Sequence, residues 1–226
     1  YRALYEPFNL HPFPAGNSGC QMGGWFKKEI KSAADLQGLK MRIPGLGGEI
    51  LRRAGGTPVS LPGGEIFTAL QTGTVDAAEW IGPYNDLTFG FHKAAKYYYY
   101  PGWHETGPAL ECMVNKEAFN SLPADLQAIV EIAASATNDQ MLAEFMARNA
   151  FALTEIEQMD DVKILPFPDD VMTALKQASD EIIAEISARD EKFKTIYQSF
   201  LGYMNTVSKW TEISEFAMLA NRYKKD

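Results

Sequence analysis

Two charged residues stand where buried strands are expected. Arg42 lies within an apolar run at residues 41–43, and Glu79 ends another apolar run at residues 74–79. Parallel strands are usually buried on both faces, so a charge there must be paired, hydrogen-bonded or ready to meet a ligand. The planar guanidinium of Arg42 suits a carboxylate held by two hydrogen bonds. The alternative is an internal ion pair between Arg42 and an acid such as Glu65 or Glu79.

Glu79 poses an electrostatic problem for a carboxylate site. An anionic ligand bound by Arg42 would be repelled by a second carboxylate close by, and a cation between the two acids would remove that repulsion. Carboxylate, amide and carbonyl oxygens are the ligands that a hard cation prefers. We therefore expect a metal site made of Glu79, an amide such as Gln21 and a backbone carbonyl, completed by oxygens of the bound acid.

Residues 40–83 must position this site. Three apolar runs, at residues 41–43, 57–61 and 74–79, alternate with two short helix-like segments, and glycine or proline marks each junction. This pattern predicts a βαβαβ unit with a parallel sheet whose loops gather at the strand ends. The glycines of residues 45–48 lack the spacing of a dinucleotide-binding turn, so they predict turn geometry instead.

The rest of the chain predicts further strands and long helices. Residues 1–13 read as extended and residues 15–24 as a glycine-rich loop that could project Gln21 into a cleft. Strands are expected at residues 96–100 and 108–115. A helix over residues 121–158 would be about 55 Å long, enough to brace two lobes.

The C-terminal part, residues 169–226, is expected to be helical. It carries a periodic aromatic stripe, which predicts a packing surface against the lobes or a second subunit. The stripe consists of Phe193, Tyr197, Phe200 and Tyr203.

Composition excludes several classes of function. The 226-residue chain has a net charge of −8, and it lacks a basic run that would favour nucleic acid. Its three histidines have no metal or hydrolytic spacing, and no G-x-S-x-G motif occurs, which favours a binding protein over an enzyme. Two cysteines, Cys20 and Cys112, fit a cytoplasmic or a periplasmic protein, and their separation in sequence leaves pairing open. No apolar run is long enough to span a membrane.

The sequence resembles the periplasmic solute-binding proteins of TRAP transporters. The family pattern of a Lys-x-Arg strand, a Leu-Gln-x-Gly turn and a Val-Asp strand appears as residues 40–42, 70–73 and 75–76. Longer runs resemble the subgroup that binds 2-oxo acids such as pyruvate. These runs are residues 14–17, 21–25, 79–86 and 97–104.

The resemblance implies a site and a function. In that subgroup a metal ion, typically sodium, bridges the protein and the oxo acid. Carried over, Gln21 and Glu79 would be side-chain metal ligands, Trp80 would give its carbonyl, and Arg42 would bind the carboxylate. The implied protein is a non-enzymatic receptor in the periplasm that delivers a carboxylate to a membrane permease. Calcium is the alternative ion. A homodimer through the C-terminal helices is a further expectation.

The resemblance also implies an α/β, two-lobed fold like that of periplasmic binding proteins, with a long bracing helix and a helical C-terminus. Family members carry an N-terminal lobe before the segment that matches Tyr1, so residues 1–226 are expected to be roughly the C-terminal two-thirds of a receptor. Residues 1–78 and 108–165 should then form most of the second lobe, and residues 81–104 should contribute to the first.

Overall fold

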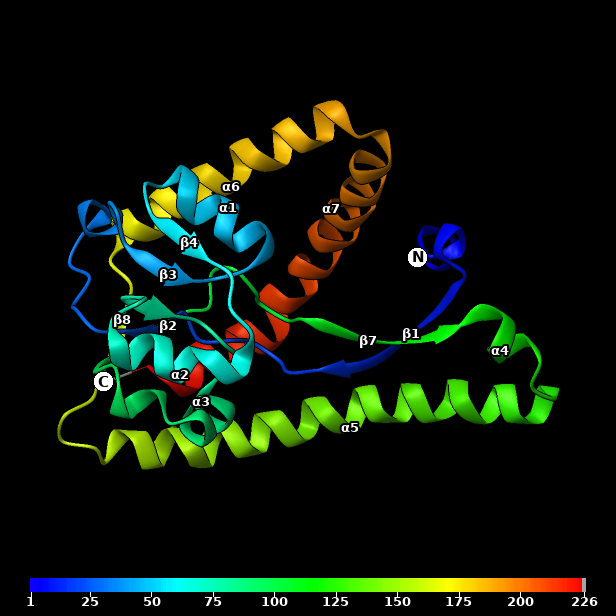
Figure 1. Ribbon diagram of the computed structural model, residues 1–226, viewed down its shortest axis with the longest axis horizontal. Helices are drawn as coiled ribbons and strands as arrows, with labels where there is room; N and C mark the ends of the chain where they lie inside the picture. The colour runs from blue at the N-terminus through cyan, green and yellow to red at the C-terminus, as the bar shows by residue number, and fades with distance from the viewer. Residues whose placement is uncertain (225–226) are drawn as a thin grey trace. The chain divides into compact units, whose positions relative to one another are not determined.

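The structure is a computed structural model that describes residues 1–224 (Figure 1). It divides into two compact units, residues 1–176 and 177–226, which we describe separately. Helix α6 (Asp169–Arg189) begins in the first unit and ends in the second.

The first unit contains a six-stranded mixed sheet. Its strand order is β4-β3-β5-β2-β6-β8, with β3 parallel to both β4 and β5, and β2 antiparallel to β5 and β6. The strands are β2 (Gly24–Phe26), β3 (Lys40–Arg42), β4 (Thr57–Val59), β5 (Ala77–Ala78), β6 (Tyr97–Tyr100) and β8 (Lys163–Pro166). The predicted βαβαβ unit is therefore confirmed. Its helices are α1 (Gly45–Arg53) and α2 (Gly63–Thr72), and α2 ends at Gly73 in a left-handed conformation (φ 78°) that glycine adopts without strain.

Two strands lie outside this sheet. β1 (Leu10–Asn17) pairs antiparallel with β7 (Ala109–Asn115) in a separate two-stranded sheet. The extended segment expected at residues 1–13 is wrong at its start, where two short 3-10 helices, Arg2–Leu4 and Glu6–Phe8, precede β1. The loop expected at residues 15–24 is also too long, because β1 continues to Asn17.

Both sheets join strands that lie far apart in the chain. Strand β6 lies in the same sheet as β3, and β7 pairs with β1. Local patterns identify a strand but not its partner, because pairing depends on contacts between distant segments.

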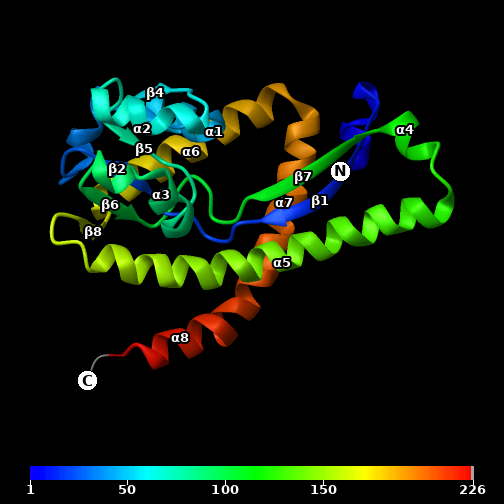
Figure 2. The same cartoon turned by 60° about the horizontal axis from the view of Figure 1, so that its bottom comes forward.

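The long helix is α5 (Ala124–Glu157), of 34 residues or about 51 Å at 1.5 Å per residue. The prediction began it at residue 121, but a short helix α4 (Lys116–Asn120) comes first and Pro123 is the N-cap of α5. Figure 2 shows α5 running along β1 and α3 (Pro83–Phe89), which it contacts over much of its length.

The core of the first unit packs α2, α3 and α5 against the sheet. Trp25 and Tyr98 are fully buried and stacked, with ring centroids 4.1 Å apart. Burying an aliphatic or aromatic side chain contributes about 1.5–3 kcal/mol. The other buried members of this cluster are Ile66, Ala69, Leu70, Val75, Ala78, Phe91, Ala95 and Ile156.

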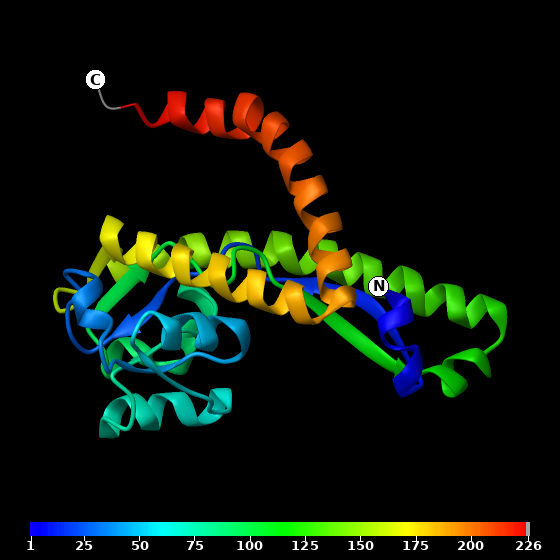
Figure 3. The same cartoon turned by 90° about the horizontal axis from the view of Figure 1, so that it is seen from above.

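The second unit is helical, as expected. α7 (Glu191–Thr211) begins where Asp190 Oδ1 accepts a hydrogen bond from the Phe193 amide (3.0 Å), a typical N-cap. It continues through a π-helical segment, Glu212–Phe216, into α8 (Ala217–Arg222), and Figure 3 shows this run as one curved helical segment. Residues 225 and 226, the end of the predicted helical segment 169–226, lie outside the described residues. Among residues 1–224, no helix combines the length and hydrophobicity needed to cross a membrane.

Candidate functional site

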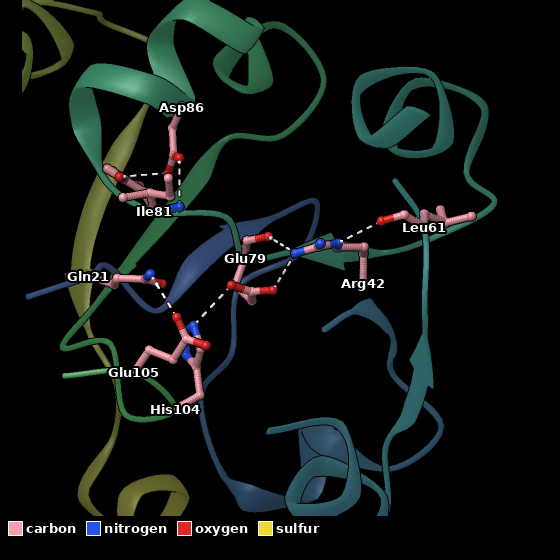
Figure 4. A network of polar contacts seen from close by, with 9 residues as sticks. Gln21, Arg42, Leu61, Glu79, Ile81, Asp86, His104 and Glu105 are labelled. Atoms are coloured by element: carbon pink, nitrogen blue, oxygen red, sulfur yellow. Dashed lines mark hydrogen bonds and ion pairs between the residues drawn. The ribbon is translucent and has the colours of Figure 1, made fainter. Parts of the chain in front are cut away.

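Arg42 and Glu79 form a buried ion pair at the ends of β3 and β5. Arg42 Nη1 lies 2.5 Å from Glu79 Oε1, and the two side chains are 9% and 4% exposed (Figure 4). Nη1 also donates to the Glu79 carbonyl (3.1 Å), and Nε donates to the Leu61 carbonyl (3.2 Å). Of the partners considered from sequence, the structure selects Glu79, because the parallel strands β3 and β5 bring the two residues together.

Trp80 covers the guanidinium. The Arg42 Cζ atom lies 5.0 Å from the Trp80 ring centroid, a cation–π distance. The ring packs beside Gly63, where a Cβ atom would come within 2.6 Å of it. Arg42 is thus held by carbonyls, a carboxylate and an aromatic face, which fixes the direction of its donors.

His104 completes the surroundings of Glu79. Its Nε2 lies 3.0 Å from Glu79 Oε2, and its side chain is 3% exposed. Sequence reasoning missed His104, because a lone histidine without close metal-ligand spacing is usually structural. Its place in the turn after β6, within the run that resembles the 2-oxo-acid subgroup, was the available signal.

Gln21 presents an amide oxygen that is buried and lacks a partner. Its Nε2 donates to Glu105 Oε2 (2.9 Å), whereas Oε1 has no hydrogen-bond partner among residues 1–224. A buried acceptor without a donor is costly, and a cation would satisfy it. Glu105, which the sequence did not single out, lies next to His104 in the chain and so joins Gln21 to the Arg42–Glu79 pair (Figure 4).

The donor set fits a hard cation only if amide and carbonyl oxygens take part. Within residues 1–224, no three His, Cys, Asp or Glu side chains are grouped so as to hold a metal by themselves. Gln21 Oε1 and the Glu79 carboxylate would supply side-chain oxygens, and the Trp80 carbonyl would supply a main-chain oxygen. Oxygen donors of this kind suit sodium or calcium rather than zinc.

A hydrogen bond links the backbones beside these ligands. The Met22 amide donates to the Ile81 carbonyl (3.0 Å), and the Ile81 amide donates to Asp86 Oδ1 (3.3 Å). Asp86 is 1% exposed, and burial raises its pKa to about 7 against the opposing effect of its hydrogen-bond donors. The two cysteines play no part here, since Cys20 and Cys112 are free and exposed.

The fold agrees with that of known proteins to which the sequence is similar. A family model described as bacterial extracellular solute-binding protein, family 7, matches residues 2–190. The chain belongs to this family of transport receptors.

Similar proteins indicate which kind of solute-binding protein the chain resembles. The chain is 45% identical over 214 residues to the monocarboxylate 2-oxoacid-binding periplasmic protein of Nostoc sp., covering 95% of this chain and 58% of that protein. It is also similar to a TRAP periplasmic solute-binding protein from Colwellia psychrerythraea, solved with bound calcium and pyruvate (TM-score 0.94, 45% identity, 97% of this chain and 67% of that chain).

A second solved structure differs in the bound ion. It is a TRAP periplasmic solute-binding protein from Pseudoalteromonas atlantica T6c with bound sodium and pyruvate (TM-score 0.94, 42% identity, 99% of this chain and 68% of that chain). The similarity confirms the predicted fold class. The present chain spans 58% of the length of the curated relative from Nostoc.

Proposed function

We propose that this chain captures a small 2-oxo monocarboxylate such as pyruvate through a bridging metal ion. Arg42 binds the carboxylate, and the cation is held by Gln21 Oε1, the Glu79 carboxylate and the Trp80 carbonyl. The observation that carries the proposal is the buried Arg42–Glu79 pair, joined through His104 and Glu105 to the unpartnered oxygen of Gln21. Calcium or sodium accompanies pyruvate in two similar structures, which supports both the ion and the acid.

Charge balance explains why the acid and the ion bind together. Arg42 and Glu79 neutralise each other, so a monocarboxylate alone would leave a net negative charge in a buried site, at a high desolvation cost. A sodium ion with the acid restores neutrality. Calcium in place of sodium would leave one positive charge, next to the solvent-exposed Glu105, which is not counted in this buried balance.

The existing contacts suggest how the acid gains its donors. Arg42 Nη1 donates to both the carboxylate and the carbonyl of Glu79. A cation on Glu79 draws that carboxylate's charge away from Arg42, so Nη1 becomes available to the acid. The bound acid and ion favour a closed form through contacts that exist only in that form.

The transport role follows from the family. We infer that the protein works in the periplasm and delivers the acid to TRAP membrane permease subunits, and that it is not an enzyme. A receptor of the same type for lactate or a sugar acid, with calcium as the bridge, is the nearest alternative. An enzyme acting on small carboxylic acids is the second alternative, and turnover of pyruvate would support it.

A homodimer through the C-terminal helices is a separate part of the proposal. Its support is the exposed apolar surface of α7, where Phe200, Tyr203 and Trp210 are 57%, 71% and 62% exposed. Large exposed apolar patches often mark protein interfaces. Light scattering should give twice the chain mass, with Tyr203→Glu and Trp210→Glu together restoring the monomer. A monomer for the wild type would contradict this part alone.

Isothermal titration calorimetry tests the binding function. Pyruvate, lactate and galacturonate are each titrated into the purified protein with sodium, with calcium, or with a chelator in sodium-free buffer. We expect pyruvate to bind most tightly and to require a cation. Tighter binding of lactate or galacturonate would favour the alternative receptor, and consumption of pyruvate would identify an enzyme.

A further inference from the structure

We propose that Asp86 is a positioning residue that sets the spacing between the two chain segments carrying the proposed metal ligands. The proposal rests on the proposed cation site for its functional meaning. Gln21 lies in one segment, and Glu79 and Trp80 lie in the other. Asp86 itself would touch neither the ion nor the acid.

A backbone hydrogen bond joins the two segments near the ligands. The Met22 amide donates to the Ile81 carbonyl (3.0 Å), one residue after Gln21 on one side and one residue after Trp80 on the other. The Ile81 amide donates to Asp86 Oδ1 (3.3 Å). The Ile81 peptide is therefore held from both ends, and a shift of Ile81 would change the distance between Gln21 Oε1 and the ligands that follow β5.

Asp86 is anchored to the sheet as well as to this loop. Its Oδ2 accepts hydrogen bonds from Tyr98 Oη (2.8 Å) and Trp25 Nε1 (3.1 Å). Both aromatic side chains are fully buried and stacked on each other, on β6 and β2. The Asp86 carboxylate thus connects the buried Trp25–Tyr98 stack to the Ile81 loop, which lies outside the strands.

The helix that bears Asp86 is also fixed. The Asp86 backbone amide donates to the Gly82 carbonyl (2.9 Å), and the Tyr84 amide donates to Asn149 Oδ1 on α5 (3.0 Å). A Cβ atom at Gly82 would lie 3.2 Å from that same Asn149 oxygen, so helix α3 approaches α5 closely at this point. Asp86 is therefore anchored through α3 to α5 as well as to the sheet.

The donors around Asp86 suit an ionised carboxylate, the form that prevails above about pH 7. Three donors, from Ile81, Trp25 and Tyr98, converge on two oxygens (Figure 4 shows the contact with Ile81). An asparagine offers one oxygen, so its amide group would face either the Ile81 N–H or the Trp25 N–H, neither of which can accept a hydrogen bond. Asp86→Asn therefore keeps the shape but forces the loop or the indole to move.

The first measurement needs no ligand. Amide hydrogen exchange at Ile81 and Met22, followed by NMR, is compared for wild type, Asp86→Asn and Tyr98→Phe. We expect Asp86→Asn to speed exchange at both amides by about tenfold or more, relative to its effect on the β3 amides. Tyr98→Phe removes one donor but keeps the Ile81 bond, so its two amides should stay within about threefold of wild type.

The second measurement is the calcium affinity of the same proteins by calorimetry, at a temperature where all are folded. Mutations of outer-shell partners typically cost about 10–100-fold in metal affinity. We expect a loss of that size for Asp86→Asn and less than about threefold for Tyr98→Phe. If Asp86 had only a structural role, calcium affinity would instead fall in proportion to the loss of stability in both variants.

The outcomes are separable. If Asp86→Asn has the same exchange rates and the same calcium affinity as the wild type, the positioning proposal is wrong. If the wild type binds neither calcium nor sodium, with or without pyruvate, the proposed function is wrong, and the exchange rates then decide the structural part of this proposal. If Asp86→Asn does not fold, Asp86→Glu, whose carboxylate is displaced by one methylene, is expected to show the same losses, and unchanged exchange and affinity in that variant would overturn the proposal equally.

Discussion

Arg42 and Glu79 end neighbouring parallel strands and share an ion pair of 2.5 Å that is almost fully buried. Arg52 and Glu49 form a pair of the same length on the surface of α1, where both side chains are 57% exposed. The two pairs differ in burial but not in distance. They therefore allow the cost of removing a buried guanidinium to be measured against a surface control.

Removal of the buried guanidinium should affect both stability and binding. Arg42→Ala leaves the Glu79 carboxylate buried without its main partner, which costs about 3–5 kcal/mol of unfolding free energy. Arg52→Ala should cost at most about 1 kcal/mol. Urea denaturation compares the two variants.

The same pair tests the carboxylate clamp. Loss of a charge-assisted bond to a buried ligand costs about 2–5 kcal/mol, so pyruvate affinity should fall at least about 30-fold in Arg42→Ala. Arg52→Ala should bind as wild type does. An Arg42→Ala protein that is folded and keeps full pyruvate affinity would show that Arg42 does not bind the acid.

A glycine beside Gln21 offers a test that changes no charge. A Cβ atom at Gly102 would lie 2.4 Å from the Gln21 carbonyl oxygen, which accepts the Gly102 amide hydrogen bond at 3.0 Å. Gly102→Ala must therefore displace Gln21. We expect calcium affinity to fall about tenfold or more, because metal sites depend on exact ligand placement.

Gly107 supplies the matched control in the same loop. A Cβ atom there meets nothing within 4 Å, so Gly107→Ala should leave calcium affinity unchanged. Calorimetry with calcium alone measures both variants. Equal affinities for the two alanine variants would indicate that Gln21 is not a metal ligand.

Asp86 predicts a pH dependence of stability. Its pKa in the folded protein is about 7, against an ordinary value of 3.8, so the folded state holds a proton that the unfolded state has released. The free energy of unfolding should therefore fall as pH rises from about 4 to 7, and this contribution should be flat above that range. The shift of about three pH units sets an upper limit of about 4 kcal/mol.

Comparison with Asp86→Asn isolates this contribution. Urea denaturation of both proteins from pH 4 to pH 8 gives the difference in unfolding free energy, from which titrations common to both proteins cancel. His92, whose pKa burial lowers from 6.5, is one such group near Trp25. A difference that stays constant across this range would contradict the raised pKa of Asp86.

The sequence predicted the local units of the site but not their partners. The βαβαβ unit followed from periodicity and glycine placement, and the misplaced charges Arg42 and Glu79 marked the site. His104 and Glu105 escaped notice because their contacts join segments far apart in the chain, and neither belongs to a close-spaced motif. The sequence did not single out Asp86, since its burial depends on Trp25 and Tyr98 from two other strands.

The main feature of the fold that the sequence did not predict is which strands pair with each other. β6 and β7 were recognised as strands, but their sheets were not, because both require pairing over long sequence separations. The antiparallel position of β2 between β5 and β6 likewise has no local signal. This pairing brings the Gln21 segment beside the Ile81 segment. The proposed site therefore depends on this pairing, whereas the sequence indicated only its charged residues, Arg42 and Glu79.

Joint binding of the acid and a cation at Glu79 can be tested by one titration. Titration of pyruvate into wild type and Glu79→Gln, with calcium and then with a chelator in sodium-free buffer of equal ionic strength, tests it most directly. Removal of the cation should weaken pyruvate binding to wild type by about tenfold or more. Glu79→Gln, which keeps an oxygen for Arg42 but loses the charge, should show little dependence on the cation. Equal pyruvate affinity of the wild type with and without cation would show that the acid binds without the ion.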